Sequence, residues 1–289
     1  MVSERIPFAK MSGSGNDFVV VDNRAGVIPA ASVAEFARLV CRRGIAVGAD
    51  GVVLIESPVA PGEPAPHFRW RYVNADGTDG EMCGNGAMCG ARFAFLQGTA
   101  PAQCAFQTAS GIVHAEVDGD GSSPIVRLKM VDPSIVRVNL ALEASGPLRN
   151  VHCVTVGVPH AVVLTEDVVS FAPGEAFLAM GRAVRYHHRF APEGTNFDAI
   201  EVRDRHRLQM RTYERGVEDE TLACGTGAVA GAVVAARLGL VESPVEVVTK
   251  SRRVLGVDFA WDGSHATGVT LSGEARVVAS GEIWPEALA

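Results

Sequence analysis

The pentapeptide Cys-Gly-x-Gly-Ala occurs twice in this chain of 289 residues, at Cys83–Ala87 and again at Cys224–Ala228. Each copy leads into a run of small and apolar residues that stops at a glycine, Gly98 in the first case and Gly239 in the second. A helix that is apolar on nearly every side must be buried, and glycine is common just beyond a helix end. The repeat therefore predicts two related halves, each built around one buried helix.

Segments typical of strands surround both predicted central helices, which we place at 84–96 and 225–238. His67–Asn74, for example, alternates apolar and polar residues as a half-buried strand does. Two further helices are expected, one opening with the capping box Ser32–Glu35 and one beginning at Pro173. The predicted fold is α/β (α+β), with two pseudo-symmetric halves, each a curved and mostly antiparallel sheet or barrel around its buried helix.

The dipeptide Asp132-Pro133 is the best candidate for the crossing between the halves, because such a pair favours a turn. We expect residues 1–132 to form the N-terminal half and residues 133–274 the C-terminal half, each with one copy of the motif. The last strand, about 275–289, is expected to return to the N-terminal half.

Composition and charge narrow the possible partners. Hydrophobic residues make up 47% of the chain, enough for a substantial core, and the formal net charge is −7. Nucleic acid and anionic membranes both favour a basic face, so neither is expected as a partner. Residues 1–5 lead directly into a strand-like run, and no apolar run is long enough to span a bilayer. We therefore expect a cytoplasmic protein that binds a small molecule.

The chain has six cysteines, and none of them forms Cys-x-x-Cys or a spacing typical of zinc sites. Because nothing else indicates secretion, free thiols are expected rather than disulfides. The cysteine spacing predicts no metal site, and no cofactor is expected. Outside the two motifs, a cysteine is most simply a small buried core residue. This interpretation applies to Cys41, Cys89, Cys104 and Cys153.

The position of Cys83 and Cys224 at predicted helix starts indicates acid–base chemistry. A helix N-terminus presents unpaired N–H groups that bind carboxylates. It also stabilises a thiolate, which lowers the pKa of a cysteine there below the free value of about 8.5. The motif glycines would let a ligand approach the backbone closely. Two such ends that face each other would hold one carboxylate and place a sulfur on each side of the adjacent carbon. That arrangement suits racemisation, with one thiolate removing a proton and the opposite thiol delivering another.

Eight short motifs follow one another along the chain. They are Gly-Ser-Gly-Asn16-Asp-Phe, Gly48-Ala-Asp-Gly, Asn74-Ala-Asp-Gly, Cys83-Gly-Asn-Gly-Ala, Pro159-His160, Gly194-Thr-Asn196, Glu214-Arg215-Gly and Cys224-Gly-Thr-Gly-Ala. In this order they resemble the diaminopimelate epimerase family of cofactor-independent enzymes with two cysteines. The resemblance covers nearly the whole chain. Taken alone, His160 and Glu214 could each be a structural polar group or a functional one.

The resemblance implies an active site in the cleft between the two halves, with Cys83 and Cys224 as the base and acid. It implies that His160 and Glu214 assist the cysteines, with Glu214 also near the reacting amine. Backbone N–H groups would hold the α-carboxylate at Gly84, Asn85, Gly225 and Thr226. The pocket would be lined by Asn16, Asn74, Asn196 and Arg215, with Arg215 as a fork for the distal carboxylate. The family also suggests a homodimer.

Three departures from the family pattern are visible. Val158 stands where the family usually has an asparagine that binds the distal end of the substrate, and Met88 replaces the usual arginine after the first motif. Arg252-Arg253 replaces a Gly-Gly turn. The change at Val158 bears on which amino acid is the substrate.

Four functions are therefore weighed from the sequence. The first is an epimerase that interconverts LL- and meso-2,6-diaminopimelate for lysine and peptidoglycan precursor synthesis. The second is a racemase of the same fold that acts on another amino acid, such as histidine. A thiol redox protein and a non-catalytic carboxylate-binding module are the remaining two, and neither accounts for paired thiols beside polar pocket residues.

Overall fold

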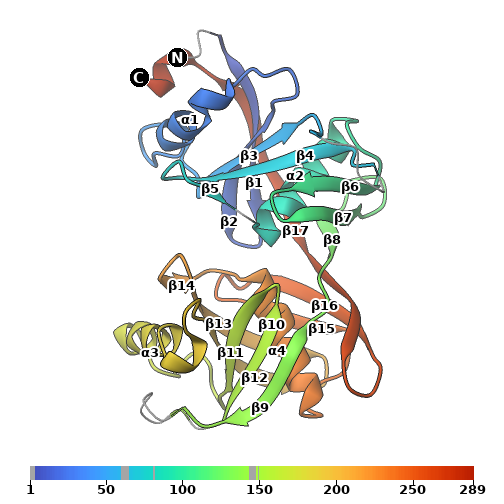
Figure 1. The fold of residues 1–289 in the computed structure, drawn as a ribbon. Coiled ribbons are helices and arrows are strands. Elements are labelled where there is room, and N and C mark those ends of the chain that lie inside the picture. The colour runs from blue at the N-terminus through green and yellow to red at the C-terminus, as the bar shows by residue number, and fades with distance from the viewer. Residues whose placement is uncertain (1–3, 60–64, 81, 143–147, 149) are drawn as a thin grey trace. The chain divides into compact units, whose positions relative to one another are not determined.

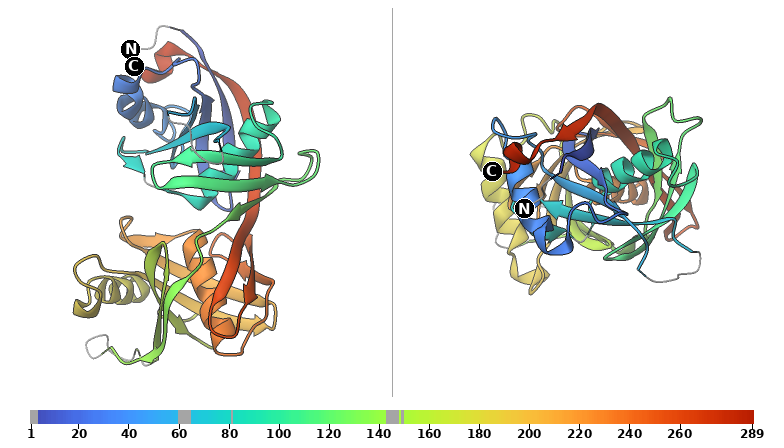
Figure 2. Two further views of the ribbon diagram at one scale, coloured as in Figure 1. Left: turned by 45° about the vertical axis from the view of Figure 1, so that its right-hand side comes forward. Right: turned by 90° about the horizontal axis from the view of Figure 1, so that it is seen from above.

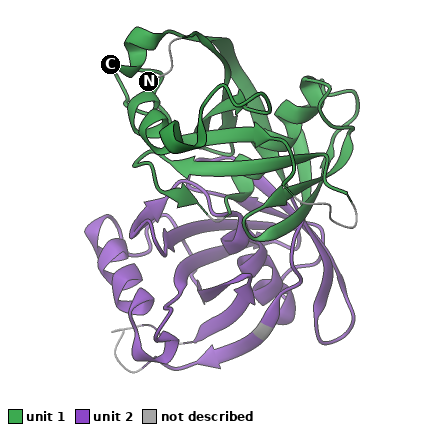
Figure 3. Cartoon of the chain, turned by 45° about the horizontal axis from the view of Figure 1, so that its top comes forward, with its two compact units in different colours: residues 1–128, 272–289 green, residues 129–271 purple. Residues whose placement is uncertain are grey.

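The structure is a computed structural model and describes residues 4–59, 65–80, 82–142, 148 and 150–289. The chain divides into two compact units, coloured separately in Figure 3. Unit 1 comprises residues 1–128 and 272–289, and unit 2 comprises residues 129–271.

The strands of unit 1 form a closed barrel of eight. In the order in which they pair, they are β17 (Ala266–Ile283), β1 (Ile6–Gly13), β2 (Asn16–Asp22), β3 (Gly51–Glu56), β4 (Phe68–Asn74), β6 (Gln103–Thr108), β7 (Gly111–Val117) and β8 (Ile125–Lys129). β8 pairs again with β17, which closes the ring, and the short β5 (Asp79–Gly80) adds to β4. The β2–β3 and β4–β6 pairs are parallel. The β17–β1, β1–β2, β3–β4, β6–β7 and β7–β8 pairs are antiparallel.

Helix α2 (Gly84–Leu96) lies inside this barrel, in contact with β1, β2, β3, β4 and β7 (Figures 1 and 2). Ten of its residues are buried, from Asn85 to Ala94, as expected for a helix enclosed on every side. The helix ends at the residue predicted, and Gly98 follows it with a φ of 68°, the left-handed conformation of a C-terminal cap.

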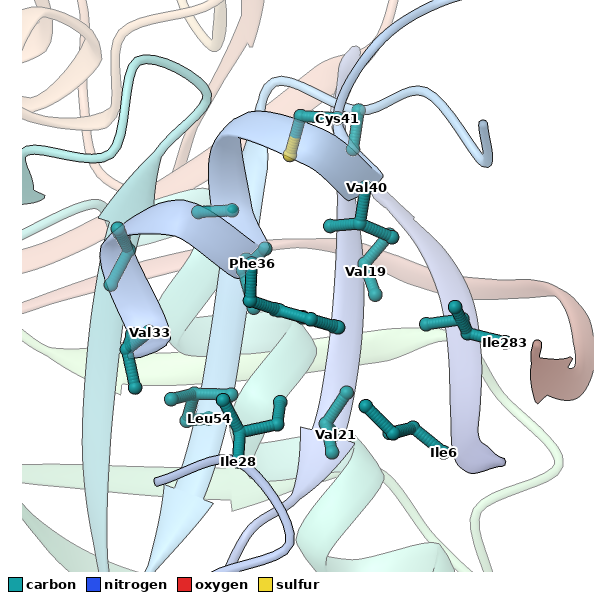
Figure 4. Packing of buried hydrophobic residues seen from close by; sticks show 14 residues of the cluster. Ile6, Val19, Val21, Ile28, Val33, Phe36, Val40, Cys41, Leu54 and Ile283 are labelled. Carbon is teal, nitrogen blue, oxygen red and sulfur yellow. The ribbon is translucent and has the colours of Figure 1, made fainter. Parts of the chain in front are cut away.

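Helix α1 (Val33–Val40) covers the outside of the same barrel, next to the short 3-10 helix η3 (Pro285–Leu288). Its apolar side packs Phe36 and Val40 against Val19 and Leu54 of the sheet (Figure 4). The predicted capping box does not form, because Ser32 makes no side-chain capping bond. The 3-10 turn η1 (Ala30–Ser32) precedes the helix and holds Ser32 at φ −100° and ψ −7°, away from the extended conformation that a capping residue needs.

Unit 2 repeats the plan around helix α4 (Gly225–Arg237). Its strands are β9 (Ser134–Leu140), β10 (Val151–Val156), β11 (Val158–Leu164), β12 (Asn196–Asp204), β13 (Arg207–Glu214), β14 (Asp219–Thr221), β15 (Val245–Val248), β16 (Val254–Trp261) and the start of β17. β9 to β13 pair in sequence, β13 also pairs with β14 and β15, and β15 pairs with β16. α4 contacts β10, β11, β12, β13, β15 and β16, and nine of its residues are buried.

Helix α3 (Glu175–Arg185) packs on β12 and β13 of unit 2, where Phe177 and Val184 join Phe197 and Tyr213 in a buried cluster. It begins two residues later than the sequence predicts, because Gly174 takes the N-cap position with a φ of 58°. A short 3-10 helix, η2 (His188–Phe190), follows it. The predicted fold class is confirmed: the chain is mixed α/β, with a closed eight-stranded barrel around a central helix.

Candidate active site

Both motif cysteines occupy the N-cap position of a central helix. Cys83 precedes α2 with φ −137° and ψ 111°, and Cys224 precedes α4 with φ −130° and ψ 114°. The sulfur of Cys83 accepts a hydrogen bond from the N–H of Gly86 at 3.5 Å, and that of Cys224 lies 3.5 Å from Thr226 Oγ1. The extended cap leaves the first N–H groups of each helix without intrahelical acceptors. Gly84, Asn85, Gly225 and Thr226 carry these N–H groups.

Neighbouring side chains of the same unit lie close to the motif glycines. A Cβ atom on Gly227 would lie 2.6 Å from the Asp198 carboxylate, and one on Gly225 would lie 2.7 Å from Leu271. A Cβ atom on Gly86 would touch Trp70 and Phe18 at 3.4 to 3.5 Å. Close packing within unit 2 therefore favours glycine at positions 225 and 227, whereas the contacts at Gly86 are ordinary van der Waals distances. The role of these glycines in ligand approach stays a prediction.

In unit 1, the predicted pocket residues Asn16 and Asn85 contact each other. Asn85 Nδ2 donates to Asn16 Oδ1 at 2.8 Å, and Asn16 Nδ2 donates to Asp50 Oδ2 at 3.2 Å. Asn85 Oδ1 is buried and has no hydrogen-bond partner within the described part of the chain. Asn74, at the end of β4, donates instead to Thr78 Oγ1 at 3.0 Å.

An ionic network that the sequence did not reveal holds the start of β2, where Asn16 lies. Arg43 donates to Asp17 and, at 2.7 Å, to Asp50, while Lys10 lies 2.6 Å from Asp17. The N–H groups of Asp17 and Asp50 each donate to the carboxylate of the other, both at 3.1 Å. Burial acts to raise the pKa of Asp17, but the hydrogen bonds from Arg43 and Lys10 outweigh it and lower that pKa. The acidic residues lie within two of the short motifs, which was the available signal.

In unit 2, the parallel pairing of β11 with β12 places His160 opposite Asn196. Asn196 Nδ2 lies 3.4 Å from His160 Nε2 and 3.3 Å from the carbonyl of Pro159. Its Oδ1 accepts the backbone N–H of Arg215 at 2.7 Å, and the Arg215 guanidinium donates to the carbonyl of Glu193 at 3.3 Å. Three predicted site residues are thereby joined in one hydrogen-bonded group.

Asp198 is a residue of this site that sequence reasoning missed. Its Oδ2 lies 2.7 Å from His160 Nδ1, and both side chains are fully buried. Thr212 Oγ1 donates to the other carboxylate oxygen at 2.7 Å. The available signal was the spacing, because residues two apart, such as Asn196 and Asp198, point to the same face of a strand.

Two carboxylates influence the second cysteine. Burial, and then the negative charges of Glu214 and Asp198, raise the pKa of the Cys224 thiol well above its usual value. Glu214 ends β13, and burial raises the pKa of its carboxyl too. Cys224 is consequently a thiol at neutral pH. The expectation that a helix start lowers a cysteine pKa is wrong for Cys224, since burial beside two acids outweighs the helix end.

No group of three or more His, Cys, Asp and Glu side chains in the described part of the chain is placed to hold a metal ion. No helix within it is both long and apolar enough to cross a membrane.

The fold and the sites define a class of protein with two related α/β units, each with a buried central helix capped by a cysteine. A solved structure with the same fold is the phenazine biosynthesis protein of the PhzF family from Bacillus anthracis. The TM-score to it is 0.71 at 13% sequence identity, over 97% of this chain and 99% of that chain. At this identity the similarity establishes the fold alone.

Sequence comparison identifies the family. The Diaminopimelate epimerase family model matches residues 8–136 and 152–276. The diaminopimelate epimerase of Aquifex aeolicus is 39% identical over 288 residues, covering 97% of this chain and 99% of that protein. The Chlorobaculum tepidum protein of the same name is 40% identical over 276 residues, covering 94% and 99%. The chain belongs to the diaminopimelate epimerase family.

Proposed function

We propose that this protein is an epimerase that interconverts LL- and meso-2,6-diaminopimelate without pyridoxal phosphate, in the synthesis of lysine and peptidoglycan precursors. One observation carries the proposal. In a chain of this family, Cys83 and Cys224 cap equivalent helices with φ and ψ angles that agree within 7° and 3°. A two-base inversion at a carbon atom requires one acid–base group for each face.

In the proposed reaction, Cys83 and Cys224 act on opposite faces of the substrate α-carbon. The thiolate takes the α-proton, and the S–H of the opposite thiol breaks as its proton goes to the other face. Because burial and two acids favour the thiol at Cys224, we assign the first proton abstraction to Cys83. The N–H groups at the starts of α2 and α4 hold the α-carboxylate and stabilise the developing enediolate.

The roles proposed for the remaining residues follow the family resemblance. Arg215 binds the distal carboxylate, and Asn16, Asn74 and Asn196 line the pocket. The carboxyl of Glu214 lies near the reacting amine. Asn85 Oδ1 is buried and has no partner among the described residues, so it is free to accept a hydrogen bond from a substrate ammonium group.

A racemase of another amino acid, such as histidine, is the second candidate, and Val158 is the observation that favours it. Val158 begins β11, two residues before His160. An isopropyl side chain cannot donate or accept the hydrogen bonds that an asparagine would offer to a distal carboxylate or ammonium.

The reaction is tested by following incorporation of deuterium at the α-carbon in heavy water, with diaminopimelate and histidine as separate substrates. We expect exchange and epimerisation with diaminopimelate. Exchange with histidine alone would establish the second candidate, and tight binding without exchange would indicate a carboxylate-binding module.

The two-base step is tested with Cys83→Ala and Cys224→Ala. Each should lower two-way epimerisation by about 10³-fold or more, because each removes one acid–base group. Cys104→Ala in unit 1 and Cys153→Ala in unit 2 are the matched controls, since burial raises the pKa of both thiols to about 11 and neither caps a helix. Full activity in both motif variants would refute the mechanism.

We also propose a cytoplasmic homodimer. All six cysteines are free, which suits a reducing compartment. Val278 and Trp284, near the C-terminus, expose 63% and 49% of their surface, which a partner subunit would cover. Light scattering on the eluting protein should give twice the 30.4 kDa chain mass.

A further inference from the structure

Asp198 has an environment that a merely structural acid does not need. Its carboxylate is fully buried, where an unpaired charge would be very costly. It accepts hydrogen bonds at 2.7 Å from His160 Nδ1 on β11 and at 2.7 Å from Thr212 Oγ1 on β13. On α4, Gly227 omits the side chain that would lie 2.6 Å from this oxygen. Three elements, β11, β13 and α4, thus surround the carboxylate that β12 carries.

The contact with the Asp198 carboxylate determines which nitrogen of His160 carries the proton. A carboxylate only accepts hydrogen bonds, so the Nδ1 atom that it contacts must be the protonated one. In neutral His160 the other nitrogen, Nε2, is then an acceptor. Asn196 Nδ2 lies 3.4 Å from Nε2, and its amide is fixed by the bond from the Arg215 N–H to its Oδ1. The imidazole is therefore held at both nitrogens.

We propose that Asp198 is a positioning residue, which keeps His160 in the tautomer that accepts a proton at Nε2 and stabilises the imidazolium that results. The inference rests on the proposed function, since the proton comes from a thiol of the reacting pair. In that step the S–H bond breaks and an Nε2–H bond forms, leaving a thiolate and an imidazolium, and the 3.4 Å contact of Nε2 with Asn196 Nδ2 is given up. Glu214 and Cys224 are the other titratable groups of this site, and the charge of Glu214 acts on both His160 and Cys224.

The first variant is Asp198→Asn, which keeps the shape and removes the charge. With Thr212 still donating to Oδ1, the new amide turns its NH₂ group towards His160 Nδ1, which favours the Nε2–H tautomer. We expect kcat to fall by about 10²–10⁴-fold with KM changed by less than about threefold, because orientation of a general base is lost. In ¹⁵N spectra of labelled histidine, the protonated nitrogen of His160 should change from Nδ1 to Nε2.

Glu201→Gln is the matched control, since Glu201 is also a buried acid on β12. It accepts the Val168 N–H at 3.0 Å and pairs with Arg203, and it makes no contact with His160. Its neutralisation should lower stability and leave kcat and the His160 spectrum unchanged. Equal losses of kcat in both variants, or an unchanged His160 spectrum in Asp198→Asn, would overturn the proposal.

If the Asp198→Asn protein does not fold, Thr212→Val is the second variant that tests the proposal. It removes one hydrogen bond to the carboxylate and retains the charge, so kcat should fall by about 10-fold or less with the Nδ1–H tautomer kept. Loss of that tautomer with unchanged kcat would contradict the role of Asp198. Failure of the proposed function would appear separately, as wild-type protein with no α-proton exchange and an intact Nδ1–H signal.

Discussion

At the residue scale, two glycines of α4 have different neighbours: one packs against an apolar side chain, and the other packs against the Asp198 carboxylate. Gly231 faces Ile200, whose Cγ2 would lie 3.0 Å from an added Cβ. Gly227 faces the Asp198 carboxylate and Met210 at 2.6 and 3.1 Å. The two glycines are four residues apart on the same buried helix. Replacing each by alanine therefore compares the effect of one added methyl group on two different sets of neighbours.

We expect Gly231→Ala to destabilise the protein by about 1–3 kcal/mol through overpacking, with kcat retained. Gly227→Ala should cost stability and also lower kcat by at least about 10-fold, because the added methyl group displaces Asp198. Thermal unfolding and steady-state kinetics check both variants. An equal kcat in the two would show that Asp198 can move without consequence.

A second residue-scale prediction concerns the Cys224 thiol. Because the charge of Glu214 raises its pKa, Glu214→Gln should lower the pH at which this thiol ionises. The measurement is the ultraviolet absorbance of thiolate against pH, in a Cys83→Ala background with and without the Glu214 change. The same titration in a Cys83→Ala/Glu201→Gln protein is the control and should show no displacement.

At the scale of elements, the loop between β1 and β2 is held by charge. Asp17 bonds to Arg43 and Lys10, and Asp50 of the loop before β3 anchors Asn16. The loop itself turns through Ser14 and Gly15 with φ angles of 50° and 116°. This network, rather than the glycines alone, determines where Asn16 and its partner Asn85 lie.

The network gives a pH dependence with a definite sign. The pKa of Asp17 is lower in the folded protein than its usual value of 3.8, so its ionisation stabilises the fold above about pH 4. That contribution disappears as the pH falls through the folded-state pKa. Asp17→Asn should therefore unfold more readily than wild type at pH 7, and the difference should shrink below about pH 4. Urea unfolding at several pH values measures it, and a constant difference would contradict the assignment.

At the scale of the whole molecule, the chain leaves unit 1 after β8 and returns to it along β17. β1 pairs with β17 from Ile6 opposite Ile283 to Gly13 opposite Ala275, and β8 pairs with the same strand. Unit 1 is thus discontinuous in sequence, whereas unit 2 is one continuous segment, 129–271.

Removing residues 272–289 should open the unit 1 barrel, since both neighbours of β17 lose their partner. We expect unit 1 to lose its protected amides while unit 2 keeps a cooperative transition, and hydrogen exchange resolved by peptide would measure this. Retained protection in β1 and β8 would show that the barrel does not need the strand.

Much of the fold could be predicted because local patterns impose it. The small-residue runs after the two cysteines permit only enclosed helices, and α2 begins and ends where expected. Predictions at helix starts were weaker: the capping box at Ser32 does not form, and α3 begins at Glu175 because of Gly174. Backbone conformation there depends on the preceding turn, which a four-residue pattern does not include.

By itself, the sequence determined the family resemblance, the two capped helices and the choice of Cys83 and Cys224, since each depends on residues adjacent in the chain. Only the tertiary structure decided that the charges of Glu214 and Asp198 act on Cys224, and that His160 is hydrogen-bonded to Asp198. These contacts arise from the parallel register of β11 and β12, strands separated by the whole of α3. Such a register is chosen by packing against the central helix, and no local pattern records it.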